Sequence, residues 1–132
     1  MDAPVATTSR SALVLGAARG IGLATVRRLA ADGHHVTATW HRNEPGDEGG
    51  PHVTWRRCDA TVSAEVDALF GEARDRDQPF EVAVANAALV RDRLASRMTD
   101  DDFRAVLVVN LEGTFRVPPA ALAGLARRRW GR

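Results

Sequence analysis

Three glycines spaced as GxxxGxG dominate the chemistry that this sequence can support. Gly16, Gly20 and Gly22 follow an apolar run and precede an amphipathic segment. A turn that leaves a strand and begins a helix exposes unpaired N–H groups and the positive end of the helix dipole, and both attract phosphate. Glycine permits a positive φ and lets a diphosphate approach without a Cβ in its way. Glycines also form ordinary turns, but between these flanking segments the spacing predicts a dinucleotide pyrophosphate site.

The residues after the second predicted strand indicate which dinucleotide such a site would select. A carboxylate there would bind the adenosine ribose and repel a 2′-phosphate, whereas a guanidinium accommodates the phosphate. Here His41 and Arg42 follow the strand, with no acid before Glu44. Residues 16–22 are called the glycine loop below. Within this loop, Arg19 adds a second planar cation. The pattern predicts NADP(H) rather than NAD(H); the alternative is that Arg42 is a solvated loop residue.

Neither a metal site nor a reactive thiol is indicated. The single cysteine, Cys58, cannot form an internal disulfide and has no base nearby, so it is interpreted as a strand-end residue. The histidines show neither HExxH nor paired Cys/His spacing. A formal net charge of +1 argues against a dedicated nucleic-acid or acidic-membrane surface. Residues 1–10 look like a flexible N-terminus without a signal sequence, so a cytoplasmic protein without a membrane span is expected.

The elements that must position these residues alternate between strands and helices. A continuous apolar run such as residues 12–15 is typical of a strand covered by helices on both faces. The turn-rich residues 43–51 replace the helix expected between the second and third strands. Strands are predicted at 11–15, 35–40, 52–57 and 80–85, and helices at 21–32, 63–74 and from residue 99 onward. Right-handed crossovers then give an α/β, Rossmann-type doubly wound parallel sheet with strand order 3-2-1-4.

Several residues mark the ends or interruptions of the predicted helices. Gly33 is expected to end the first helix and Ser63 to cap the second. Thr99 begins a capping box ahead of the last helical region. Pro118 and Pro119 fall inside that region, where an interior proline costs about 3 kcal/mol, so a kink or a restart is expected there.

The sequence resembles the short-chain dehydrogenase/reductase family, and within it the beta-ketoacyl-acyl-carrier-protein reductases. The resemblance runs through the glycine loop, Asp59, the Asn86-Ala87-Ala88 segment, residues 91–98 and residues 109–115. It covers the whole chain but only about the first half of a typical family member. It therefore implies a partial Rossmann domain over residues 11–132, truncated after the fourth strand and the helices that follow.

The resemblance also implies which residues border the cofactor NADP(H). Asp59 would contact the adenine edge, although a turn-forming aspartate ahead of Thr61 fits equally well. Ala88 stands where the family has a glycine. If that position needs a positive φ, the alanine costs about 1 kcal/mol and the loop would be slightly displaced. The full predicted set is Gly16, Arg19, Gly20, Ile21, Gly22, His41, Arg42, Asp59, Asn86, Ala87 and Ala88.

One residue, Asn110, matches a catalytic position of the family. There an asparagine helps to hold a water that links the active-site lysine to solvent; an asparagine that satisfies a neighbouring backbone is the alternative. The family's catalytic serine, tyrosine and lysine would lie beyond Arg132. Because the chain contains no tyrosine and no lysine, it is expected to be inactive by itself.

Two functions follow from these observations. The first is the cofactor-binding portion of an NADP(H)-dependent ketoreductase that acts on an acyl-thioester or polyketide-like ketone. The second is a degenerate, non-catalytic nucleotide-binding or interaction module. The resemblance implies a homo-oligomer, but the prolines lie in the helix that would form its interface and put that assembly in question. An uncovered fourth strand would make the chain poorly stable or prone to aggregation.

Overall fold

Four parallel strands form one sheet in the order β3-β2-β1-β4. In the computed structural model, which describes residues 8–46 and 48–132, the strands are β1 (Ser11–Leu15), β2 (His35–Trp40), β3 (Val53–Arg57) and β4 (Val82–Ala85). The Rossmann-type sheet and the strand order predicted from the sequence are confirmed. Residues 1–7 of the expected flexible N-terminus lie outside the described residues, and Ser9 Oγ donates a hydrogen bond to Gly33 O over 2.7 Å.

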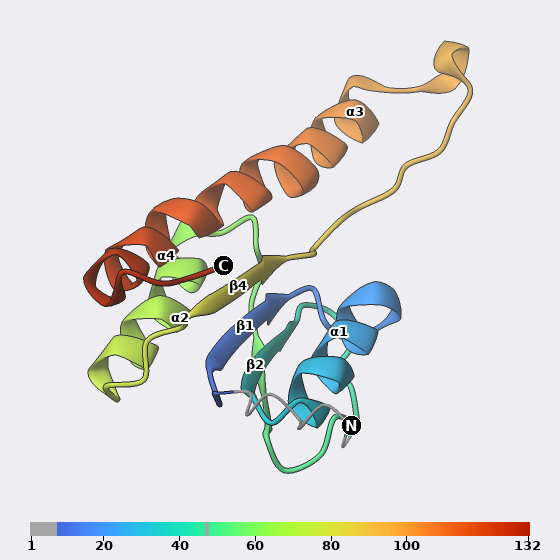
Figure 1. The fold of residues 1–132 in the computed structure, drawn as a ribbon. Coiled ribbons are helices and arrows are strands. Elements are labelled where there is room, and N and C mark those ends of the chain that lie inside the picture. The colour runs from blue at the N-terminus through green and yellow to red at the C-terminus, as the bar shows by residue number, and fades with distance from the viewer. Residues whose placement is uncertain (1–7, 47) are drawn as a thin grey trace, which may run out of the picture.

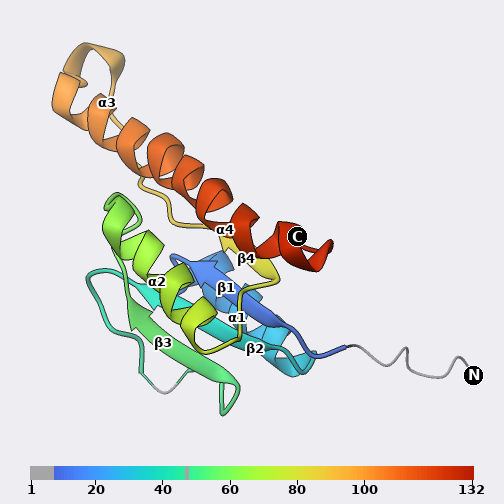
Figure 2. The same cartoon turned by 90° about the vertical axis from the view of Figure 1, so that its left-hand side faces the viewer.

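Helices cover both faces of the sheet (Figures 1 and 2). One face packs against α1 (Gly20–Ala31), and the other packs against α2 (Ser63–Asp75) and α4 (Thr114–Arg128). The described residues between β2 and β3 contain no helix, as the turn-rich sequence predicts. Beyond β4 the chain runs out from the body and returns through a continuous helical rod, as Figure 1 shows. The rod consists of α3 (Asp100–Leu107), the π-helical η2 (Val108–Gly113) and α4, and the separate short turn η1 (Ala95–Arg97) precedes it.

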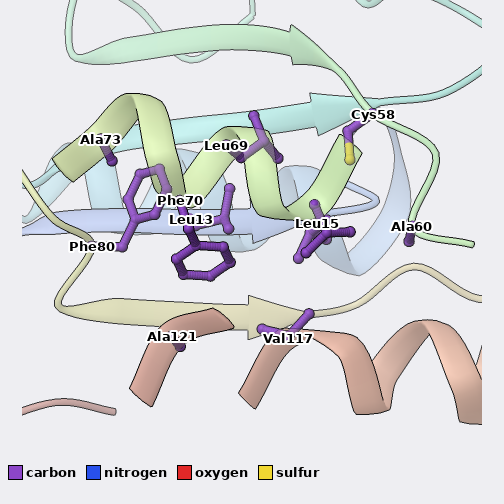
Figure 3. Packing of buried hydrophobic residues seen from close by; sticks show 11 residues of the cluster. Leu13, Leu15, Cys58, Ala60, Leu69, Phe70, Ala73, Phe80, Val117 and Ala121 are labelled. Carbon is purple, nitrogen blue, oxygen red and sulfur yellow. The ribbon is translucent and has the colours of Figure 1, made fainter. Parts of the chain in front are cut away.

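The central strand β1 contributes to two hydrophobic cores at once. Leu13 and Leu15 belong to the cluster formed with α2 and α4, shown in Figure 3, whereas Ala12 and Val14 pack on the side of α1. Successive side chains of a strand point to opposite faces, so a strand with helices on both sides has to be apolar throughout. In the cluster of Figure 3, the rings of Phe70 and Phe80 meet edge to face with centroids 5.4 Å apart.

The predicted end of α1 is confirmed. Gly33 has φ +86°, its N–H donates to Ala30 O over 3.0 Å, and His34 N donates to Leu29 O over 3.0 Å. This pair of bonds is a Schellman motif, in which a left-handed residue satisfies the last carbonyls of the helix. Glycine adopts that conformation without the steric cost of a Cβ.

Of the two predicted N-caps, one is confirmed and one is wrong. Thr99 Oγ accepts a hydrogen bond from Asp102 N over 3.1 Å and caps α3. The N-cap of α2 is instead Val62, with no side-chain capping bond, and Ser63 is already helical. The hydroxyl of Ser63 accepts a hydrogen bond from Arg116 Nε over 2.9 Å, so a contact with a distant helix replaces the local cap.

Of the kink or restart expected at the prolines, the restart does not occur. α4 continues through Pro118 and Pro119 to Arg128, and the departure from α-helical geometry is the π-helical η2 that precedes α4. Prolines at these positions leave the carbonyls of Thr114 and Phe115 without their usual donors. Both of those residues are exposed, so water can satisfy the carbonyls and the helix persists.

The edge of β4 is paired at its beginning. Ala83 N donates to Arg132 O over 2.9 Å, and Arg132 N donates to Glu81 O over 3.1 Å, which is the pattern of a parallel ladder. Nearby, the guanidinium of Arg10 lies 3.0 Å from the carboxylate of Glu81 and 3.4 Å from the ring centroid of Trp130. The last residues are therefore held alongside the sheet. None of the described helices is long and apolar enough to cross a membrane.

Replacing Asp77 by glycine should stabilise the fold. Asp77 has φ +54° and occupies at the end of α2 the position that Gly33 occupies at the end of α1, with Gln78 N donating to Ala73 O over 2.9 Å. Glycine removes the strain of the left-handed conformation, so we expect a gain of about 0.5–1 kcal/mol in the free energy of unfolding. Urea denaturation measures it. Gly33→Ala is the matched variant and should lose about 1 kcal/mol, and a loss for both variants would contradict this account.

Candidate dinucleotide-binding site

The glycine loop joins β1 to α1 at the carboxyl edge of the sheet. Gly16 and Gly20 have φ of +72° and +57°, values that side-chain-bearing residues rarely adopt. The strand order changes direction here, since β2 lies on one side of β1 and β4 on the other. In open parallel sheets, ligands bind outside the carboxyl ends of the strands at this kind of switch point.

Close backbone packing explains why two of these positions are glycine. A Cβ on Gly22 would lie 2.3 Å from Gly16 O and 2.6 Å from Asn86 Nδ2, and a Cβ on Gly16 would lie 2.5 Å from the Cα of Ala87. Around Gly20 there is nothing within 4 Å of such a Cβ. The loop is therefore packed tightly against the residues that follow β4 on its inner side and is open on the outside at Gly20.

A buried threonine that sequence reasoning missed anchors the loop. Thr39 is 1% exposed, and its Oγ1 accepts a hydrogen bond from Gly16 N over 3.1 Å. Ala17 N donates to the backbone oxygen of Thr39 over 2.8 Å. The one signal in the sequence is a hydroxyl within the otherwise apolar second half of β2. Its role depends on the β1–β2 pairing, which residue type alone does not reveal.

The outer side of the loop is open and suited to an anion. Within the described residues, the N–H groups of residues 18–22 have no hydrogen-bond partner, and the first turn of α1 contains no acidic residue. Arg19 and Ile21 are exposed beside these groups, Ile21 by 78%. Unpaired N–H groups at the positive end of a helix, with an arginine among them, form a favourable setting for an anion.

The segment after β4 closes the inner side of the loop. Asn86 Nδ2 donates to Gly16 O over 2.8 Å, and Asn86 N donates to Leu15 O over 3.2 Å. Ala87 lies against Gly16. Ala88 is not among the described residues with positive φ, so the alanine does not strain the backbone there. The structure thus brings Asn86 and Ala87 to the glycine loop and leaves Ala88 exposed beyond it.

At the ends of β2 and β3, the side chains of His41 and Asp59 are in contact, with 3.2 Å between Nε2 and Oδ2. Asp59 also accepts hydrogen bonds at Oδ1 from Thr61 N over 2.9 Å and from Thr61 Oγ1 over 2.7 Å, which is the turn geometry that the sequence allowed as an alternative. The pKa of Asp59 is lowered overall. Burial is the largest single influence and acts to raise the pKa, but the hydrogen bonds from Thr61 and the charges of His41 and Arg57 together outweigh it. Arg42 is exposed next to this pair.

The lone cysteine behaves as a buried apolar side chain. Cys58 is 4% exposed and belongs to the core cluster of Figure 3. Burial, together with the negative charges of Glu65 and Asp59, raises the pKa of its thiol to about 11. A nucleophilic cysteine needs the opposite shift, because the thiolate is the reactive form.

The side chain of Asn110 pairs with the backbone of Leu89. Its Oδ1 accepts from Leu89 N over 2.7 Å and its Nδ2 donates to Leu89 O over 3.0 Å. Asn110 lies in the π-helical η2, and its backbone oxygen accepts from Thr114 Oγ1 over 2.8 Å. The side chain thus satisfies neighbouring backbone groups, which was the alternative interpretation of Asn110 in the sequence analysis. It also connects the segment after β4 to the helical rod. Unlike the buried residue of that alternative, Asn110 is exposed.

Unpaired N–H groups and exposed arginines at this edge suit an anionic ligand. The predicted binding residues gather in two groups, one at the glycine loop and Asn86 and one at His41 and Asp59, both at the carboxyl ends of the strands. Over the described part of the chain, no three histidine, cysteine, aspartate or glutamate side chains are grouped as metal ligands would be.

Comparison with known proteins agrees with this geometry. A family model described as short chain dehydrogenase matches residues 10–132. The 3-oxoacyl-(acyl-carrier-protein) reductase MabA of Mycobacterium tuberculosis is 44% identical over 124 residues, which make up 94% of this chain and 49% of that protein. The 3-oxoacyl-(acyl-carrier-protein) reductase FabG of Escherichia coli is 31% identical over 126 residues, covering 92% of this chain and 51% of that protein. The chain spans about half the length of the curated relatives it matches.

Proposed function

The chain belongs to the short chain dehydrogenase family, and from that premise we propose that residues 11–132 form the cofactor-binding part of an NADP(H)-dependent ketoreductase. The glycine loop holds the pyrophosphate of the cofactor. Asp59 borders the adenine, and His41 and Arg42 lie toward the 2′-phosphate. The relatives named as 3-oxoacyl-(acyl-carrier-protein) reductases support a ketone carried on an acyl thioester as the substrate.

One observation carries this proposal, namely the open outer side of the glycine loop. Gly20 has room for a ligand where a Cβ would meet no atom within 4 Å, and the N–H groups of residues 18–22 have no partner among the described residues. A doubly charged diphosphate accepts hydrogen bonds from several such groups at once. Thr39 and Asn86 hold the loop in this shape from its inner side.

The charges at the end of β2 support NADP(H) as the cofactor. Arg42 is exposed, Arg19 lies in the neighbouring loop, and no carboxylate follows β2 before Glu44. A planar guanidinium forms paired hydrogen bonds with phosphate oxygens. The carboxylate of Asp59 is already engaged by Thr61 and His41, so it does not take the place of the ribose-binding acid that is typical of NAD(H) sites.

A nicotinamide cofactor supplies the hydride in a ketone reduction, and the protein supplies binding, orientation and a proton. In this chain, Asn110 holds the segment after β4 through Leu89. The chain contains no tyrosine and no lysine, so the proton donor of the reaction would come from residues outside it. We propose that the 132-residue chain binds the cofactor and does not reduce a ketone without such residues.

A nucleotide titration tests the proposal. NADPH fluorescence, with NADH as the comparison, should show saturable binding to the full chain and a lower dissociation constant for NADPH. We expect the preference to be about 10-fold or more, since the added phosphate forms charge-assisted hydrogen bonds of about 1.5–3 kcal/mol each. Absence of binding by either nucleotide to a folded chain, verified by circular dichroism, would rule the proposal out.

A further inference from the structure

The pair formed by His41 and Asp59 lies at the edge where the cofactor would bind. β2 and β3 pair in parallel up to Trp40 and Arg57, and Cys58 N donates to Trp40 O over 2.8 Å just beyond. This ladder places the residues that follow the two strands side by side. The side chains of His41 and Asp59 are 44% and 23% exposed, so the imidazole can meet both its partner and a ligand.

Asp59 is held in one orientation by its other contacts. Its Oδ1 accepts two hydrogen bonds from Thr61, and its N–H donates to Glu65 Oε2 over 2.7 Å. The remaining oxygen, Oδ2, points to His41 Nε2. Because the pKa of Asp59 is lowered, the carboxylate remains charged through the neutral range and offers His41 a fixed anion.

At this edge His41 stands among arginines and carboxylates, and histidine is the side-chain type whose charge can change near neutral pH. Arg42 follows it in the chain, Arg57 and Asp59 approach from the end of β3, Glu65 approaches from α2, and Arg19 lies in the glycine loop. Arginines keep their charge at all relevant pH values. A histidine gains its proton between about pH 8 and pH 5.

We infer that the His41–Asp59 pair makes the preference for NADP(H) over NAD(H) depend on pH, an inference that rests on the proposed function. Protonated His41, held by Asp59, adds a positive charge beside Arg42 in the region of the 2′-phosphate. Neutral His41 keeps its place but not its charge. NAD(H) lacks this phosphate, so its affinity does not follow the charge of His41. Asp59 acts as the positioning residue and His41 as the group that meets the phosphate.

Dissociation constants of NADPH and NADH, measured by fluorescence between about pH 6 and pH 8 at constant ionic strength, test this inference. The 2′-phosphate itself titrates near pH 6, so His41→Gln, which keeps an amide donor but no charge, serves as the reference. The quantity compared is the ratio of the NADH to the NADPH dissociation constant. Relative to that variant, this ratio should rise about threefold to fivefold in the unmodified chain as the pH falls, which corresponds to the energy of a partly exposed charge pair. His52→Gln, just before β3, is the matched control and should behave as the unmodified chain.

The imidazole NMR signal of His41 gives a readout that a purely structural role would not move. NADPH should raise the midpoint of its titration and NADH should not, because binding and protonation are linked. Failure of both nucleotides to bind would overturn the proposed function and this inference with it. NADPH binding whose pH dependence equals that of His41→Gln would overturn only the inference.

Discussion

Replacing Gly22 by alanine should weaken NADP(H) binding strongly and destabilise the fold. The added Cβ would lie 2.3 Å from Gly16 O, 2.6 Å from Asn86 Nδ2 and 2.9 Å from the Cα of Ala17. Two of these atoms are backbone, so the glycine loop would have to move. We expect a loss of about 1–3 kcal/mol in the free energy of unfolding, the usual cost of overpacking. Binding should weaken by about 100-fold, which corresponds to losing one or two charge-assisted hydrogen bonds.

Substitutions at two other glycines distinguish the effect on binding from the effect on stability. Gly46→Ala adds a Cβ with nothing within 4 Å at a position without positive φ, so it should change neither quantity. Gly33→Ala strains the end of α1 but lies outside the site, so it should lower stability and leave the dissociation constant unchanged. Fluorescence titration and urea denaturation measure both quantities for each variant. Gly22→Ala with unchanged NADPH affinity would show that the loop is not the cofactor cradle.

Replacing Arg42 by aspartate should reverse the cofactor preference. The substitution puts a carboxylate at the end of β2, where it repels a 2′-phosphate and can accept hydrogen bonds from ribose hydroxyls. We expect NADPH to bind about 10-fold to 100-fold more weakly, with NADH unchanged or bound more tightly. The fold should be unaffected, since Arg42 is exposed. Dissociation constants for both nucleotides measure the effect.

Arg74→Asp is the charge-matched control for this reversal. Arg74 is exposed in the last turn of α2, so its substitution changes the net charge equally but at a distance from the carboxyl edge of the sheet. If the net charge of the protein controlled the preference, both variants would weaken NADPH binding alike. The assignment of Arg42 would be wrong if NADH bound as tightly as NADPH and Arg42→Asp changed neither affinity.

Those parts of the fold that depend on local patterns could be predicted from the sequence. The unbroken apolar run of β1 indicates burial on both faces, and Gly33 and Thr99 mark helix ends through bonds to residues a few positions away. The order of the strands follows from right-handed crossovers, which hold for nearly all parallel sheets. Predicting these features does not require knowing which residues far apart in the sequence are in contact.

The features that sequence reasoning missed depend on contacts between distant segments. The hydroxyl of Ser63 bonds Arg116 instead of capping α2, and Thr39 anchors the glycine loop only because β2 lies beside β1. The partner of Asn110 is a backbone group in an extended segment with no periodic pattern. The persistence of α4 through its prolines depends on which carbonyls face water, a property of the packed structure.

The position of β1 in the middle of the sheet has a consequence for the order in which the chain folds. β1 pairs with β2 after one short helical crossover, but its other neighbour begins at Val82, which lies opposite Ala12. Closing the longer loop costs more entropy, and distant pairings slow folding. The side of the sheet that carries α1 should therefore assemble first. The face of β1 that carries Leu13 and Leu15 is fully covered only when β4 and α4 have packed beside α2. The nucleotide cradle, which needs Asn86 against Gly16, is completed only in that last step.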